Sequence, residues 1–205
     1  MSEFVQHAGF WWPADDTHCH SVIHDELADL DAALALVPVR KVAVQAGGNV
    51  GVWAAHLARE FEAVWTFEPV AENYRCLVKN VPTNVRFWQA GLGDKPGKVG
   101  MTIVPGNAGA HYIGGAGEID IITLDSLDLP GCDFLCLDVE GAEPMALHGA
   151  AETIRKFRPV VMMEEKGLSE RYFGIRRGAA ERWLIREHGY RVAKKVRKDM
   201  ILVPA

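Results

Sequence analysis

The chain has 205 residues, of which 49% are hydrophobic and 24% charged, and its formal net charge is −5 at pH 7. This composition is typical of one soluble globular domain. The negative charge, without a dense Lys/Arg patch, argues against nucleic acid or an anionic membrane as a partner. No apolar run approaches the roughly 18 residues that span a bilayer, and the first residues lack the pattern of a signal peptide. The cysteines form no Cys-x-x-Cys pair, which favours reduced thiols and a cytoplasmic location.

The N-terminal segment, residues 1–24, gathers histidine, cysteine and aspartate side chains. No spacing in it matches a structural zinc site, so we expect an irregular segment that lies over the entrance of a pocket. Leucines at helical spacing then predict an amphipathic helix over residues 25–37. Residues 1–38 are therefore an expected extension, and residues 39–205 the expected core of a single domain.

A short buried strand is predicted over residues 42–46, because an apolar, largely β-branched run stopped by glycines fits a parallel sheet. Apolar residues recur at helical spacing from Val50 onwards, which predicts a helix. Between the two elements, Gly47, Gly48 and Gly51 lack the Cβ atom that would hold a ligand away from the backbone. A strand, a glycine turn and a helix N-terminus together indicate a pocket for a nucleotide-like cofactor.

The second predicted strand, residues 63–67, ends in Glu68-Pro69. Glu68 lies 17 residues after Gly51, close to where such folds place the acid that binds ribose hydroxyls. A carboxylate suits that role because it only accepts hydrogen bonds and can hold both hydroxyls of a diol. The expected cofactor therefore contains a ribose.

The same patterns predict the remaining elements. These are a helix over 70–80, a strand over 85–88, a glycine-rich insertion over 92–117 with a hairpin around 99–104, strands over 119–124 and 134–139, a helix through Leu147 and Phe157, a strand over 160–163, a helix over 178–188, and terminal strands over 190–193 and 200–203.

Strands and helices alternate along the chain, which predicts an α/β fold with a doubly wound, mostly parallel sheet of seven strands. The terminal strands are too close for a helical crossover, so the last one must run antiparallel. Such a sheet, here with a hairpin insertion, is the architecture associated with class I, Rossmann-like S-adenosylmethionine (SAM) methyltransferases.

From about residue 40 to the C-terminus, the sequence resembles the FkbM-type SAM-dependent methyltransferases. The resemblance rests on the order and spacing of several short segments. These are residues 44–51, 67–69, 124–127 and 137–143, and Arg158-Pro159. It implies methyl transfer from SAM to a hydroxyl, often of a sugar or a small natural product.

The resemblance also implies the positions that bind the cofactor. Gly47, Asn49 and Gly51 would line the methionine part of SAM through backbone contacts. Gln45 stands where many relatives carry aspartate, and it would offer a carbonyl acceptor to the SAM ammonium without the charge.

Further along the chain, Glu68, followed by Pro69, would take the ribose hydroxyls. Gln89 and Ala90 would border the adenine, and Asp138 would lie beside the reacting methyl group. All of these residues follow predicted parallel strands, at the sheet edge where α/β proteins bind ligands.

Candidate catalytic residues lie at the ends of adjacent strands. Asp138 and Glu140 follow one strand, and Glu164 and Glu165 end the next. Carboxylates from adjacent strands can hold Mg²⁺ to orient an acceptor, and Asp138, Glu164 and Glu165 are the candidate ligands. Without metal, a close carboxylate pair raises one pKa and provides a general base. Glu140 alternatively caps the following helix, and His111 in the insertion is a further candidate base.

Two other functions fit parts of the sequence. The pattern Ala46-x-Gly48-x-x-Gly51 imitates the glycine motif of an NAD(P)-binding oxidoreductase without its first glycine. The glutamine at position 45 leaves open a non-catalytic binding protein with the SAM fold. The sequence does not identify the acceptor or the oligomeric state, and loops 1–24 and 105–117 are expected to set specificity.

Overall fold

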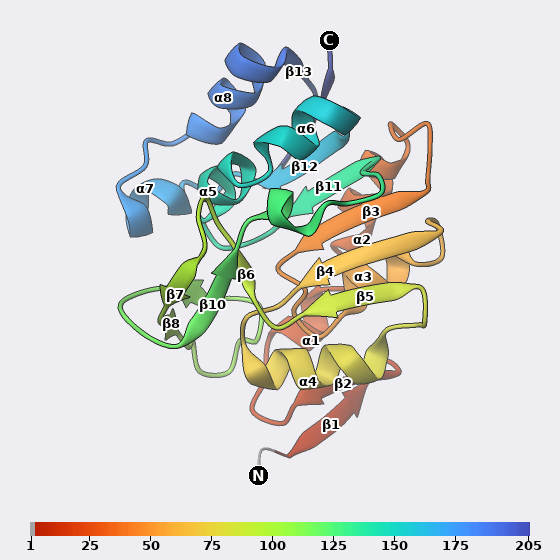
Figure 1. The fold of residues 1–205 in the computed structure, drawn as a ribbon. Coiled ribbons are helices and arrows are strands. Elements are labelled where there is room, and N and C mark those ends of the chain that lie inside the picture. Colours follow the sequence, from red (N-terminus) through yellow and green to blue (C-terminus); the bar gives the residue numbers. More distant parts are fainter. Residues whose placement is uncertain (1–2) are drawn as a thin grey trace.

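The computed structural model describes residues 3–205, and residues 1 and 2, the start of the predicted extension, lie outside the described part. A seven-stranded sheet forms its centre, in the order β13-β14-β12-β11-β3-β4-β5 (Figure 1). The strands are β3 (Val42–Ala46), β4 (Ala63–Phe67), β5 (Val85–Trp88), β11 (Phe134–Leu137), β12 (Val160–Glu164), β13 (Tyr190–Val196) and β14 (Asp199–Pro204).

The sheet is mixed. Strands β3, β4, β5, β11 and β12 pair in parallel, whereas β14 runs antiparallel to both of its neighbours, β12 and β13. Only Arg197 and Lys198 connect β13 to β14, which is too short for a parallel crossover. The predicted antiparallel last strand is confirmed.

Helices cover both faces of the sheet. Because successive strand residues point to opposite faces, neighbouring residues of one strand belong to different hydrophobic cores. Ala43 belongs to one core with helices α2 (Leu27–Leu34), α3 (Val52–Leu57) and α4 (Ala71–Asn80). Val44 belongs to a second core with α5 (Glu143–His148), α6 (Ala151–Phe157) and α8 (Ala179–His188). None of the helices between residues 3 and 205 has the length and apolar character needed to cross a membrane.

The N-terminal segment is more regular than expected. Strands β1 (Phe4–His7) and β2 (Phe10–Pro13) form an antiparallel hairpin, and α1 (Cys19–Val22) follows. Ala8 and Gly9 both have positive φ, 50° and 83°, as a two-residue hairpin turn of type I′ requires. Ala-Gly is a weak turn signal, so the prediction of an irregular segment was wrong here. The helix expected over 25–37 is shorter, Leu27–Leu34.

The glycine-rich insertion forms two small sheets. Its elements are β6 (Gly91–Leu92), β7 (Gly97–Val99), β8 (Met101–Thr102), β9 (Tyr112–Ile113), β10 (Ile119–Ile122) and the 3₁₀ helix η1 (Leu124–Leu127). β10 pairs with β6 and β7, whereas β8 pairs with β9. The hairpin expected around 99–104 is therefore wrong in its pairing. Gly100 allows the backbone to pass close to Gly114, because a Cβ at residue 100 would lie 2.5 Å from the carbonyl oxygen of Gly114.

Two further helical predictions need correction. The helix expected through Leu147 and Phe157 is divided into α5 and α6 around Gly149. A Cβ at Gly149 would lie 1.9 Å from the carbonyl oxygen of Gly93, so close packing against the insertion explains the glycine. Helix α7 (Leu168–Phe173) was not predicted. In Figure 1 the arrowheads of β3, β4 and β11 point towards the insertion, which places their carboxyl ends beside it.

Candidate functional site

A pocket of about 240 Å³ lies at the carboxyl ends of β3, β4 and β11. Two segments distant from these strands in the sequence also line it, α1 and the loop of residues 107–111. Asp16 joins these segments, because its Oδ1 accepts hydrogen bonds from the backbone N–H groups of Cys19 (3.2 Å) and Ala108 (2.9 Å). The side chain of Asn73 on α4 donates to the carbonyl oxygen of Ala108 at 2.8 Å. Parts of both loops expected to set specificity thus reach the pocket.

The glycine turn after β3 brings two strand ends into contact. Gly47 has φ +84°, and a Cβ on it would lie 1.8 Å from the carbonyl oxygen of Asp138. Gly48 lines the pocket beside it. Gly51 does not line the pocket: its φ is +93°, and a Cβ there would meet Val81 at 2.8 Å. Gly51 therefore serves the packing of α3 against α4, which the sequence pattern could not distinguish from ligand contact.

Asn49 follows the turn with a positive φ of 47°. Its backbone N–H donates to Glu68 Oε2 at 2.7 Å, and its side-chain Nδ2 donates to Cys19 Sγ at 3.2 Å. Its Oδ1 atom is buried and accepts no hydrogen bond from residues 3–205. A buried acceptor without a donor is costly, so Asn49 offers this oxygen to a ligand.

Glu68 is 5% exposed and lies at the end of β4 with Pro69, and both line the pocket. Its Oε1 accepts the backbone N–H of Val70 at 2.8 Å, so each carboxylate oxygen has one backbone donor and keeps a free lone pair. Burial raises the pKa of Glu68 to about 8, although the hydrogen bonds from Val70 and Asn49 oppose the shift.

Gln45 does not lie in the pocket. It is 1% exposed, its Nε2 donates to the carbonyl oxygen of Gly47 at 2.7 Å, and its Oε1 accepts from the hydroxyl of Thr66. Gln45 and Thr66 are partners in the β3–β4 register, so the amide completes a cross-strand pair. The carbonyl predicted to accept from an ammonium is therefore already used inside the protein.

The residues expected to border the adenine lie next to the pocket in the sequence but are not part of its lining. Gln89 and Ala90 do not line the pocket, whereas the next two residues, Gly91 and Leu92, do. Met101 and Ile113, on the paired strands β8 and β9, line the same pocket. Sequence reasoning missed this pair, because only the non-local pairing of the insertion brings them to the cavity.

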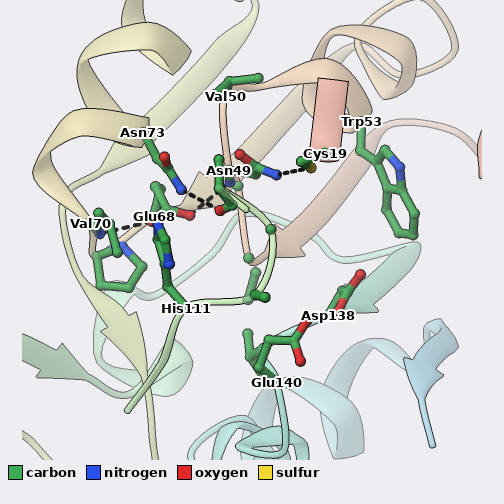
Figure 2. Close-up of a pocket in the computed structure, with 18 of the residues that line it drawn as sticks. Cys19, Asn49, Val50, Trp53, Glu68, Val70, Asn73, His111, Asp138 and Glu140 are labelled. Carbon is green, nitrogen blue, oxygen red and sulfur yellow. Dashed lines mark hydrogen bonds between the residues drawn. The ribbon is translucent and has the colours of Figure 1, made fainter. Parts of the chain in front are cut away.

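His111 lines the pocket, but on the side of Glu68 and Val70 (Figure 2). Its Nδ1 accepts the backbone N–H of Val104 at 3.1 Å, and burial lowers its pKa. Asp138 and Glu140 lie on the other side of the pocket (Figure 2). The structure therefore does not bring the candidate bases His111 and Asp138 together.

Asp138, Glu140 and Glu164 form a cluster whose carboxylate oxygens lie within 4.8 Å of one another. Asp138 and Glu140 line the pocket, and Glu164 is buried beneath them. Glu165 is not a member. Its carboxylate accepts the backbone N–H groups of Gly167 and Gly178, both at 3.1 Å, so it orders the loop after β12.

The cluster shifts the ionisation of its members. Burial, then Glu164, raises the pKa of Asp138 well above its usual value, with Glu140 adding to the shift and Lys198 and Lys166 opposing it. Burial and Glu164 also raise the pKa of Glu140. Oδ1 of Asp138 is buried and has no hydrogen-bond partner among the described residues. The cluster can therefore take up a proton from a ligand.

The sequence motifs do not point to three charged residues that line the pocket, Glu26, Lys166 and Lys198. Lys166 was within reach of sequence reasoning, because it directly follows Glu164-Glu165. Lys198 lies in the turn between β13 and β14, and only the antiparallel pairing of β14 with β12 brings that turn to the pocket.

Solved structures resemble this chain in fold. The methyltransferase FkbM from Methylobacillus flagellatus is 22% identical, with a TM-score of 0.54 over 80% of this chain and 42% of that chain. Magnesium protoporphyrin IX methyltransferase from Synechocystis, solved with bound SAM, is 15% identical, with a TM-score of 0.52 over 95% and 87%. Precorrin 8w decarboxylase from Methanobacterium thermoautotrophicum is 14% identical, with a TM-score of 0.52 over 88% and 90%. The chain thus spans less than half of the similar FkbM structure.

Among curated proteins, none matches the sequence. The family model described as the methyltransferase FkbM domain matches residues 45–192, which include the glycine turn, Glu68 and the acidic cluster. This match confirms the family predicted from the sequence motifs. The chain therefore belongs to the FkbM methyltransferase family.

Proposed function

We propose that the protein transfers the methyl group of SAM to a hydroxyl of a sugar or a small natural product. The family and the fold support SAM-dependent methylation in general. The observation that carries the choice of a hydroxyl is the position of Asp138 and Glu140 across the pocket from Glu68 (Figure 2). A carboxylate beside the reacting methyl can take the proton that a hydroxyl must lose.

The donor groups of SAM match acceptors in the pocket. The ribose hydroxyls would donate to the free lone pairs of Glu68, and the ammonium would donate to the unpartnered Oδ1 of Asn49. Met101 and Ile113 offer an apolar wall for the adenine. The cavity of about 240 Å³ is smaller than most ligand sites, roughly 300–1,000 Å³, so we expect loop 107–111 to shift when SAM binds.

Gln45 gives no reason to expect a non-catalytic protein. Its amide is engaged by Gly47 and Thr66 outside the pocket, which supports a binding mode in which the side chain at position 45 does not contact the cofactor.

Methyl transfer to a hydroxyl requires the protein mainly to align two reactants and to remove a proton. When bound, SAM supplies an electrophilic methyl group on its sulfonium. Asp138 and Glu140 face the acceptor side, where burial and the nearby carboxylate of Glu164 raise their pKa values and strengthen them as bases. The proton of the hydroxyl passes to this pair as its oxygen bonds to the methyl carbon.

Incubation with methyl-labelled SAM and a panel of sugars, glycosides and small hydroxylated natural products tests the proposal. We expect label in an ether-linked methyl group and an equal amount of S-adenosylhomocysteine (SAH). Label found only in N-linked or S-linked methyl groups contradicts the choice of a hydroxyl.

We expect the affinity for SAH to rise with pH between about 6 and 8. In the free protein, the raised pKa of about 8 keeps Glu68 largely protonated at pH 7. Ribose hydroxyls that donate to its carboxylate favour the ionised form and lower this pKa. Binding should therefore release a proton, which calorimetry in two buffers of different ionisation enthalpy measures.

The matched control is Glu68→Gln, which keeps the size of the side chain but cannot ionise. It should abolish the proton release and weaken SAH binding by about 1.5–3 kcal/mol, the scale for hydrogen bonds to a charged group. The same proton release in wild type and variant would place the ribose away from Glu68.

A further inference from the structure

Two lysines flank one buried carboxylate oxygen at the acceptor side of the pocket. Oε1 of Glu164 lies 2.8 Å from Nζ of Lys166 and 3.0 Å from Nζ of Lys198. The side chain of Glu164 is 1% exposed, so it fixes both ammonium groups from beneath. The two nitrogens can be no further apart than the sum of these distances.

Each lysine also contacts an acid that lines the pocket. Nζ of Lys166 lies 3.6 Å from Oε1 of Glu140, and Nζ of Lys198 lies 2.8 Å from Oε1 of Glu26. An ammonium has three N–H donors, so two acidic contacts leave at least one donor on each lysine for another partner. Both lysines line the pocket, and their side chains are 36% and 27% exposed.

The arrangement does not suit the Mg²⁺ predicted from the sequence. Asp138, Glu140 and Glu164 are hard oxygen ligands of the required type. However, two ammonium groups already contact the buried oxygen of Glu164. A divalent cation at the cluster would have to displace both or lie beside them against like-charge repulsion. Glu165, the third predicted ligand, points to the Gly167–Gly178 loop instead.

Both lysines should carry their charge in the folded protein. Burial works against the charged form, but Glu164 outweighs it for Lys166, and Asp138 together with Glu164 outweighs it for Lys198, so the pKa of each is raised. The acceptor side of the pocket thus contains fixed positive charge next to the carboxylates that would accept a proton.

We propose that Lys166 and Lys198 take the place of a divalent cation: they bind the acceptor oxygen and stabilise its developing negative charge. The acceptor part rests on the proposed function, whereas the exclusion of a cation does not. As the hydroxyl proton passes to the Asp138–Glu140 pair, the lysine N–H groups donate to the oxygen. That oxygen bonds to the methyl carbon, and the electron pair of the broken S–C bond stays on sulfur.

Titration with Mn²⁺ alone, followed by electron paramagnetic resonance, tests the exclusion without any turnover. Wild type should bind Mn²⁺ no more tightly than Glu164→Gln, in which the cluster has lost a ligand. The double variant Lys166→Met/Lys198→Met should bind Mn²⁺ at least tenfold more tightly than wild type, because three carboxylates then lack their counter-charges. A wild-type site that binds Mn²⁺ tightly and is lost in Glu164→Gln overturns the proposal, even where the double variant does not fold.

Turnover tests the acceptor contact. Lys166→Met and Lys198→Met should each lower kcat by about 10²–10³-fold, the scale for losing one donor to a developing oxyanion, while the Kd for SAH changes less than threefold. Lys195→Met is the matched control, because Lys195 is an exposed lysine on β13 that does not line the pocket. Unchanged kcat in both pocket variants overturns the proposed contact, whereas absent SAH binding in wild type overturns the proposed function itself.

Discussion

Asp138→Asn is expected to lower methyl transfer by about two to four orders of magnitude, the usual range for general acid–base catalysis. Asp138 follows β11 and lines the pocket with Glu140. Burial and the neighbouring acids raise its pKa, so it is a stronger base than an exposed aspartate. Asparagine preserves the shape of the side chain but cannot take the proton. Single-turnover measurement with labelled SAM and an accepted hydroxyl compound checks the effect.

The affinity for SAH should change far less in this variant, because Glu68 and Asn49 hold the other side of the cofactor. Asp94→Asn is the matched control, since Asp94 is exposed in the β6–β7 loop and does not line the pocket. Full turnover in Asp138→Asn would assign a structural role to this residue. Glu140 and then His111 would be the next bases to test.

Gly47→Ala should destabilise the protein by roughly 2–5 kcal/mol, combining the cost of a left-handed conformation with that of overpacking. The added methyl group would lie 1.8 Å from the carbonyl oxygen of Asp138. β3 and β11 pair directly before this point, at Ala46 and Leu137, so their ends must separate. Denaturant unfolding measures the loss of stability, and calorimetry should find no SAH binding.

Gly115→Ala provides the matched control for Gly47→Ala. Gly115 has a similar φ of +75°, but no described atom lies within 4 Å of the position of its Cβ. This variant therefore incurs only the conformational cost, about 1–2 kcal/mol. Equal losses of stability in the two variants would show that the contact with Asp138 does not constrain the turn.

Local patterns predicted the central sheet well. A period or a spacing within a few residues predicts the strand before Gly47, the helix that ends at Asn80 and the acid at position 68. The parallel order follows from the alternation of strands and helices. These features place Asp138 and Glu68 at one edge of the sheet before any coordinates are known.

The side-chain environment of a strand residue was harder to predict. Gln45 and Glu68 both belong to motifs that suggest ligand contact, but Gln45 pairs with Thr66 inside the sheet while Glu68 reaches the cavity. Sequence spacing does not reveal which partner an amide finds. Sequence spacing likewise does not reveal that Gly51 lacks a Cβ in order to make room for α4 and not for a ligand.

Non-local contacts account for the other gaps. Lys198 reaches the cluster through the pairing of β14 with β12, and Met101 reaches the pocket through the pairing of β8 with β9. Neither pairing can be predicted from the local sequence pattern of the strands. The same limit hid Lys198, one of the two lysines that contact Glu164, and it made Mg²⁺ the simpler expectation.

Calorimetric titration of the wild-type protein with SAH and, separately, with NAD tests the central claim most directly. The glycine turn, Glu68 and the unpartnered Oδ1 of Asn49 predict binding of SAH at one site per chain and no heat from NAD under the same conditions. Micromolar binding of NAD together with no binding of SAH or SAM would contradict the assignment of this pocket to the methyl donor.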